Sequence, residues 1–170
     1  MIGLRQLGRQ PGTMRRHQAS VPAPDGFGIE GVIGVPPGAP VVLDLRLEAV
    51  SEGVFVSGTA TATAVGECAR CLDEVTEDLV VELMELYAYP DSATEASTDP
   101  DEISRVVDDS VDVEQAVRDA IVLALPLAPL CTPDCAGLCP ECGGRRAELG
   151  PEHRHETMDP RWAALLERGE

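Results

Sequence analysis

The chain has 170 residues and a formal net charge of −17, so it can form one domain with a real core, with or without a small metal-bound appendage. All thirteen basic residues are arginine, and the sequence contains neither lysine nor asparagine, a bias that we attribute to a GC-rich genome. The negative charge argues against nucleic-acid binding through the body of the protein, and the scarcity of aromatic residues argues against a stacking platform for single strands.

The first residues contain no recognisable targeting signal. Residues 1–25 are rich in arginine but lack the apolar stretch of a signal peptide, and no apolar run approaches the length of a membrane span. We therefore expect a cytoplasmic protein with no membrane partner. Because cytoplasmic thiols stay reduced, six cysteines at short spacings favour metal binding over disulfides.

Residues 1–24 carry only positive charge in a chain that is otherwise strongly acidic. They include four arginines and no acid, and residues 7–12 show no hydrophobic periodicity. We interpret them as a basic, flexible leader. The alternative is a basic arm that touches RNA or the acidic body of the protein.

The next part of the chain, residues 25–130, is predicted to form an α+β body. Apolar and polar residues alternate over the second half of residues 41–50 and over residues 54–65, with threonines on one face of the latter segment. A third strand is expected over residues 75–87. This pattern predicts an antiparallel meander or partial barrel. Cys68 and Cys71 would lie at the turn between the second and third strands.

Acidic residues concentrate in the middle of the chain. Residues 67–119 contain seventeen acids and three arginines, a net charge of −14, and residues 90–110 are polar enough to predict a mobile acidic loop. The simpler interpretation is a solvated face that keeps the protein soluble. The alternative is a docking surface for a basic partner.

Two helices are expected. Asp112 is a suitable N-cap with Gln115 at the capping-box position, and Pro126 ends the first helix. The second helix spans residues 159–168, with Asp159 as its cap and a short apolar face that includes Trp162. In the first helix apolar residues recur at helical spacing: Val113, Ala116, Val117, Ala120, Ile121 and Ala124.

The last forty residues contain a cluster of side chains that bind metals. Residues 139–143 read CPECG, the form of a zinc knuckle, in which Gly143 can adopt a positive φ and turn backbone N–H groups toward the thiolates. A second C-x2-C pair lies at residues 68–71. Together the chain offers eight candidate zinc ligands: Cys68, Cys71, Cys131, Cys135, Cys139, Cys142, His153 and His155.

These ligands can be grouped in two ways. In one, the four cysteines of residues 131–142 bind a single ion, and Cys68 and Cys71 remain a free dithiol. In the other, Cys68 and Cys71 join Cys131 and Cys135 in one site, while the CPECG pair joins the two histidines in a second. We favour the second grouping because it fills two four-coordinate sites with plausible loops, although both histidines could instead be exposed tail residues.

Either grouping indicates a structural metal site and no enzyme. Four protein ligands leave no open position for water, and the sequence contains no nucleophile–base pair, phosphate-cradling glycine loop or HExxH motif. Arg70, Arg145 and Arg146 lie close to the cysteines in sequence. They could offset the charge of a thiolate-bound ion or present a local phosphate-binding patch.

Four motifs together resemble the YceD family, whose bacterial and plastid members are needed for accumulation of the large-subunit (23S) ribosomal RNA. The motifs are GECARCL at residues 66–72, LALPLAPLC at 123–131, GLCPECG at 137–143 and DPR at 159–161. The leader sequence LGRQPG at residues 7–12 resembles the actinobacterial branch. The resemblance covers residues from about 5 to 168.

The resemblance implies a cytoplasmic, non-enzymatic role in making or stabilising the large ribosomal subunit, and frequent genetic neighbourhood with a small basic protein of that subunit. Some relatives keep the C-x-R-C pair and counterparts of Cys131 and Cys135 but lack the CPxCG motif, which favours the second grouping. Relatives with the full cluster often carry C-x-C where His153 and His155 stand here.

We therefore expect a zinc-stabilised α+β protein in which one amphipathic helix packs on the sheet, followed by a zinc-binding tail at residues 131–170. Its expected partners are large-subunit ribosomal RNA or a precursor particle, and a basic ribosomal protein held by the acidic segment. The alternative function is a thiol-redox protein or sensor that uses Cys68 and Cys71. A DNA-binding zinc ribbon is disfavoured by the charge.

Overall fold

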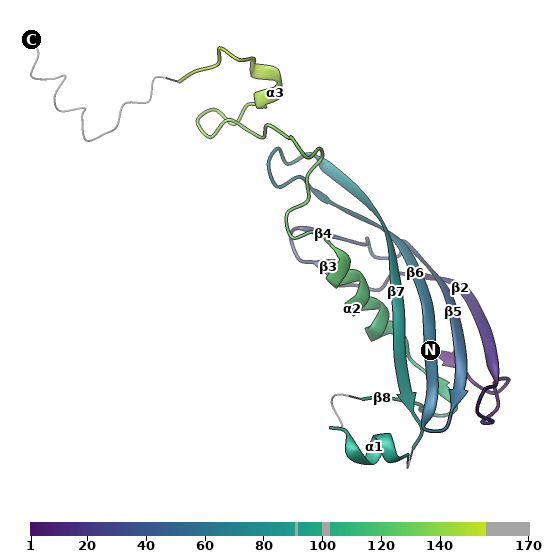
Figure 1. Ribbon diagram of the computed structural model, residues 1–170. Coiled ribbons are helices and arrows are strands. Elements are labelled where there is room, and N and C mark those ends of the chain that lie inside the picture. Colours follow the sequence, from purple (N-terminus) through teal and green to yellow (C-terminus); the bar gives the residue numbers. More distant parts are fainter. Residues whose placement is uncertain (91, 100–102, 156–170) are drawn as a thin grey trace, which may run out of the picture.

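A long antiparallel sheet forms the body of the molecule (Figure 1). The computed structural model describes residues 1–90, 92–99 and 103–155. Three consecutive strands, β5 (Pro40–Val50), β6 (Gly53–Glu67) and β7 (Glu74–Ala88), pair as the expected meander. The β6–β7 ladder runs from the pair Gly53↔Ala88 to the pair Glu67↔Glu74, so Cys68 and Cys71 lie in the connecting turn, as predicted.

Alternation along the strands divides buried from exposed side chains. In β5 the buried residues are Val41, Leu43, Leu45, Leu47 and Ala49, at every second position. β6 buries small apolar side chains on the same side, and its threonines lie on the opposite face, because successive residues of a strand point to opposite faces. The sheet is therefore open, with one face in the core and one face toward solvent.

The prediction of a flexible leader is wrong for most of residues 1–24. β2 (Met14–Pro22) pairs antiparallel with β5, β1 (Ile2–Gly3) pairs with β9 (Ser110–Val111), and the Leu7 side chain is buried. β2 escaped detection because it lies at the edge of the sheet. Its backbone hydrogen bonds hold it there, and few of its side chains are apolar.

Two short strands and a helix complete the packing around β6 and β7. β3 (Gly28–Ile29) and β4 (Ile33–Gly34) form a hairpin, and β4 pairs with the far end of β6 at Gly66. The helix α2 (Glu114–Ala124) packs against β7 and β3, with Val117 and Ile121 buried. One amphipathic helix thus covers the sheet, as expected from its 3.6-residue pattern.

The start of α2 differs in detail from the prediction. Asp112 does accept a hydrogen bond from a helix N–H, that of Glu114 at 3.0 Å. The capping box does not form, because Gln115 donates its side-chain N–H to Asp119 at 2.8 Å. The helix ends at Ala124, two residues before Pro126, as expected for a residue that cannot continue a helix.

The predicted acidic loop contains regular structure in its described part. α1 (Ala93–Ser97) is capped by Ser92, whose hydroxyl accepts from the N–H of Glu95. β8 (Ser104–Arg105) pairs parallel with the end of β7. Residue 91 and residues 100–102 lie outside the described residues, and so does the helix expected over residues 159–168.

In the part of the chain that the structure describes, no helix is both long enough and apolar enough to cross a membrane.

The packing of α2 on the sheet can be tested with two substitutions on one helix. Ile121→Ala should lower the free energy of unfolding by about 2–5 kcal/mol, because the side chain is fully buried and its removal leaves a cavity. Leu123→Ala is the control, since Leu123 is 86% exposed. Chemical denaturation followed by circular dichroism measures both, and equal effects of the two changes would contradict the burial of this face.

Candidate metal centre

One end of the sheet carries the first group of ligands. Cys68 and Cys71 lie in the β6–β7 turn, and Cys131 and Cys135 lie in the segment that follows α2. The backbone N–H of Ala69 donates to the carbonyl of Pro129 at 2.8 Å, so the two segments are joined next to the sulfurs. The Sγ atoms of Cys68 and Cys135 are 3.8 Å apart, and those of Cys71 and Cys131 are 3.5 Å apart.

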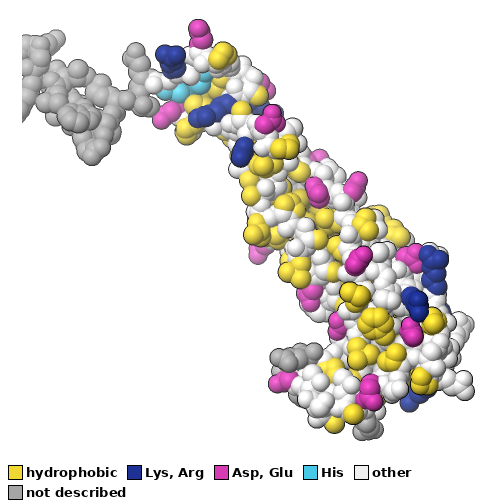
Figure 2. Space-filling view, viewed as in Figure 1, with side chains coloured by type: hydrophobic (Ala, Val, Ile, Leu, Met, Phe, Trp, Pro, Cys, Tyr) yellow, Lys and Arg dark blue, Asp and Glu magenta, His cyan; other side chains and the backbone are white. Residues whose placement is uncertain are grey.

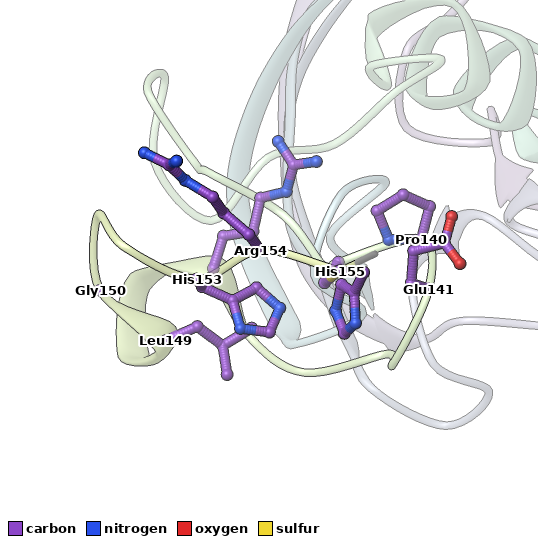
Figure 3. Close-up of a pocket in the computed structure, with 9 residues that line it drawn as sticks. Pro140, Glu141, Leu149, Gly150, His153, Arg154 and His155 are labelled. Atoms are coloured by element: carbon purple, nitrogen blue, oxygen red, sulfur yellow. The ribbon is translucent and has the colours of Figure 1, made fainter. Parts of the chain in front are cut away.

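The second group lies beyond the end of the sheet (Figure 1). Cys139 and Cys142 come from the CPECG turn, and His153 and His155 follow the short helix α3 (Arg146–Leu149). The Cys142 Sγ is 3.6 Å from Nε2 of His153. The two imidazole rings meet edge to face at a centroid distance of 4.4 Å, and Figure 3 shows both rings side by side.

The turn at Cys68 has the hydrogen bonds of a knuckle. The Cys68 N–H donates to the carbonyl of Asp73 at 2.7 Å, and the Leu72 N–H donates to the carbonyl of Cys68 at 2.9 Å. This places Leu72 at φ +63°, a conformation that leucine rarely adopts. Sequence reasoning did not single out Leu72, because glycine is the usual signal for such a position.

The CPECG turn repeats the same pattern. The Cys139 N–H donates to the carbonyl of Gly144 and the Gly143 N–H donates to the carbonyl of Cys139, both at 2.8 Å. Gly143 has φ +68°, as the sequence predicted. Two turns with unrelated sequences therefore present their cysteine pairs in one common geometry.

The sulfur and nitrogen distances fit tetrahedral coordination. A tetrahedral ion with metal–sulfur bonds of about 2.3 Å places its sulfur ligands about 3.8 Å apart, and a sulfur and an imidazole nitrogen about 3.6 Å apart. The observed separations of 3.8, 3.5 and 3.6 Å agree with these values. Within each group all four ligand atoms lie within 4.8 Å of one another, so each group could hold one metal ion.

Backbone hydrogen bonds stabilise the thiolate of one cysteine in each group, the form of cysteine that binds metals, whereas the pKa values of Cys71, Cys131 and Cys135 are raised. Hydrogen bonding from the backbone of Cys131, then of Arg70 and Cys71, lowers the pKa of Cys68 to about 6 although burial opposes the shift. In the second turn the backbone N–H groups of Cys142 and Glu141 lower the pKa of Cys139 to about 6. Each turn thus supplies a thiol that ionises readily.

Arg70 and Arg145 connect the two groups. The Arg70 guanidinium donates to the carbonyl of Cys135 at 2.9 Å, and its own carbonyl accepts from the N–H of Leu138 at 3.0 Å. Arg145 forms a two-pronged ion pair with Asp73, in the turn of the first group. Gly137, at φ +72°, passes close to the Arg70 backbone, where a Cβ would lie 3.0 Å from its carbonyl oxygen.

The structure groups the candidate ligands in the second of the two arrangements considered from the sequence. Cys131 and Cys135 join Cys68 and Cys71, while Cys139 and Cys142 join His153 and His155. Burial differs between the groups: in the first, only Cys131 is exposed, whereas in the second Cys139 is buried and Cys142 and His155 are exposed. The first group belongs to the folded body, and the second is open to solvent.

Comparisons with known proteins agree with these motifs. The family described as "Large ribosomal RNA subunit accumulation protein YceD" matches residues 56–167. The chain is 52% identical over 166 residues to the uncharacterized protein Rv2926c of Mycobacterium tuberculosis, covering 98% of this chain and 79% of that protein. It is 47% identical over 161 residues to ML1660 of Mycobacterium leprae, covering 95% and 73% of the two chains.

A more distant relative, YlbN of Bacillus subtilis, is 25% identical over 128 residues, covering 75% of this chain and 73% of YlbN. No solved structure matches. The matched residues include both cysteine turns, and the mycobacterial relatives agree with an actinobacterial type of sequence. The chain belongs to the YceD family.

Proposed function

We propose that this protein is a non-enzymatic, cytoplasmic ribosome-biogenesis factor that supports accumulation of the 23S ribosomal RNA. The observation that carries this proposal is its membership of a family whose description names that role. The geometry is consistent with a binding protein: its two ligand groups have four protein ligands each, which leaves no open coordination position for a substrate.

Zinc is the ion that best fits both groups. Zinc binds thiolate and imidazole ligands in tetrahedral geometry and has no redox chemistry of its own. Four thiolates would hold one ion in the first group, and two thiolates and two imidazoles would hold the other. Bound zinc would fix the β6–β7 turn to the chain that leaves α2, and would close the tail on itself.

The thiol-redox alternative has less support. A reactive cysteine needs access to solvent, yet the Cys68 side chain is fully buried. Its partner Cys71 is also buried, and the Cys71 sulfur lies 3.5 Å from the sulfur of Cys131, which belongs to the second thiol pair of the same group. A redox protein would show reversible Cys68–Cys71 disulfide formation while the metal stays bound.

Zinc stoichiometry tests the metal proposal. Elemental analysis of protein purified under reducing conditions should give two zinc ions per chain, falling to one in Cys68→Ser/Cys71→Ser and to one in Cys139→Ser/Cys142→Ser. Each double substitution removes two of the four ligands of one group and leaves the other group intact. A different result would contradict the first metal site: a wild-type protein with one zinc ion that is kept in Cys68→Ser/Cys71→Ser and lost in Cys139→Ser/Cys142→Ser. That result would support the redox alternative.

The acidic face favours a basic polypeptide as the protein partner. Beyond the two residues of β8, no strand in the described part of the chain pairs with the outer edge of β7, so its backbone groups are free to receive another strand. Val80 and Met84 are 69% and 72% exposed between the acids. The exposed acids of β7 are Glu74, Glu77, Asp78 and Glu82.

This partner is tested by neutralising the β7 acids. Glu74→Gln/Glu77→Gln/Asp78→Asn/Glu82→Gln should weaken the capture of purified basic large-subunit ribosomal proteins, because it removes four negative charges beside the free edge. The control neutralises four exposed acids elsewhere, Glu30, Asp134, Glu148 and Glu152. Equal capture by both variants, or by the β7 variant and the wild type, would contradict docking at this edge.

Depletion tests the ribosomal role itself. Cells that lack the protein should contain less 23S relative to 16S ribosomal RNA and fewer complete large subunits, and wild-type protein should restore both. Quantitative RNA analysis and sucrose-gradient profiles measure the two effects. An unchanged ratio of the two RNAs after depletion would refute the role, whatever the metal content of the protein.

A further inference from the structure

A cavity of about 410 Å³ lies beside the second ligand group. Its lining includes Cys139 and the two histidines together with Arg146 and Arg154 (Figure 3). A water molecule occupies about 30 Å³ of liquid, so the cavity exceeds the space of one metal ion many times over. Most of it would stay open to a second ligand with an ion bound.

The two arginines of the cavity have no acidic partner among the described residues. Neither Arg146 nor Arg154 forms an ion pair there, and neither guanidinium donates a hydrogen bond to any described group. Arg5 likewise has no acidic partner among the described residues, whereas the other arginines that precede them in the chain are engaged. Most pair with acids: Arg9 with Asp109, Arg16 with Asp44, Arg46 with Glu48, Arg118 with Glu114, and Arg145 with Asp73.

The charge around the cavity differs from that of the body. Residues 136–155 contain three arginines and three acids, so their formal charge is zero, whereas residues 67–119 have a net charge of −14. A divalent ion held by two thiolates and two neutral imidazoles would give the second group no net charge. A divalent ion held by four thiolates would give the first group a net charge of −2. Figure 2 shows arginines gathered with the histidines at this end of the molecule. An anion is therefore repelled less here than along the acidic residues 67–119.

One acid lines the same cavity and opposes an anion. Glu141 contributes its side chain to the lining. Figure 3 shows the carboxylate of Glu141 and the side chain of Arg154 pointing away from each other on different sides of the histidines. The arginine side of the cavity can therefore accept a negative group that the Glu141 side would reject.

We propose that this cavity binds the phosphodiester backbone of RNA through the guanidinium groups of Arg146 and Arg154. Guanidinium groups match phosphate oxygens with paired N–H donors, and such contacts carry affinity without reading base sequence. The phosphate stays outside the metal coordination, because four protein ligands already complete it. The choice of RNA over other polyanions rests on the proposed ribosomal role.

The test measures binding of a fluorescent single-stranded oligouridylate by the zinc-loaded full chain. Arg146→Ala/Arg154→Ala should weaken binding about 20-fold at 0.1 M salt and reduce the slope of log affinity against log salt by about 1.4, because two phosphate contacts on a single strand are lost. The control Arg16→Ala/Arg46→Ala removes the same charge from the sheet and should bind as wild type. Unchanged zinc content in both variants shows that the turns remain folded.

Three results would overturn the site. They are equal affinity of the Arg146→Ala/Arg154→Ala variant and wild type, equal weakening in the control variant, and tighter binding of a poly-glutamate peptide of matched charge than of the oligouridylate. The last would identify an acidic protein as the ligand. None of them bears on the depletion experiment, which tests the ribosomal role without these arginines, so failure of the site and failure of the role can be told apart.

Discussion

The four sulfurs of the first ligand group meet because the β6–β7 ladder fixes where the chain turns. Fifteen residue pairs, from Gly53↔Ala88 to Glu67↔Glu74, place Cys68 and Cys71 at the end of the longest hairpin. The other two cysteines, Cys131 and Cys135, lie in the segment that follows α2, and α2 packs along β7. A slip of one residue in the ladder would turn every β7 side chain to the opposite face, so the site and the core depend on one register.

The two ligand groups have different structural positions. The first forms a small buried cluster in which Cys68, Cys71 and Cys135 pack with Val75 and contact the partly buried Leu130 and Leu138. The second lies beyond the sheet and is linked to it mainly by the Arg145–Asp73 ion pair and by the hydrogen bond from the Leu138 N–H to the Arg70 carbonyl. The first can therefore stabilise the fold, while the second presents its surroundings to solvent and to a ligand.

Charge is separated along the molecule in the same way. Two of the four arginines of residues 1–24 pair with acids, Arg9 with Asp109 and Arg16 with Asp44, so about half of the positive charge that marked this segment in the sequence is neutralised. The edge of β7 keeps its acids exposed, and the far tip keeps two arginines without described acidic partners. A basic protein and an RNA strand could contact different groups of side chains on one small chain, since each is attracted where the other is repelled.

The sequence by itself determined the elements whose signal is local. Alternation defined β5 and β6, helical spacing defined α2, and the C-x2-C pairs with Gly143 identified the ligand turns, since each depends on neighbours within a few residues. Only the tertiary structure decided which cysteines meet, because Cys68 and Cys131 are distant in sequence and the ladder and helix packing bring them together. The tertiary structure also decided that residues 14–22 form a strand. β2 is held by backbone pairing with β5, an interaction that leaves no pattern in the side chains.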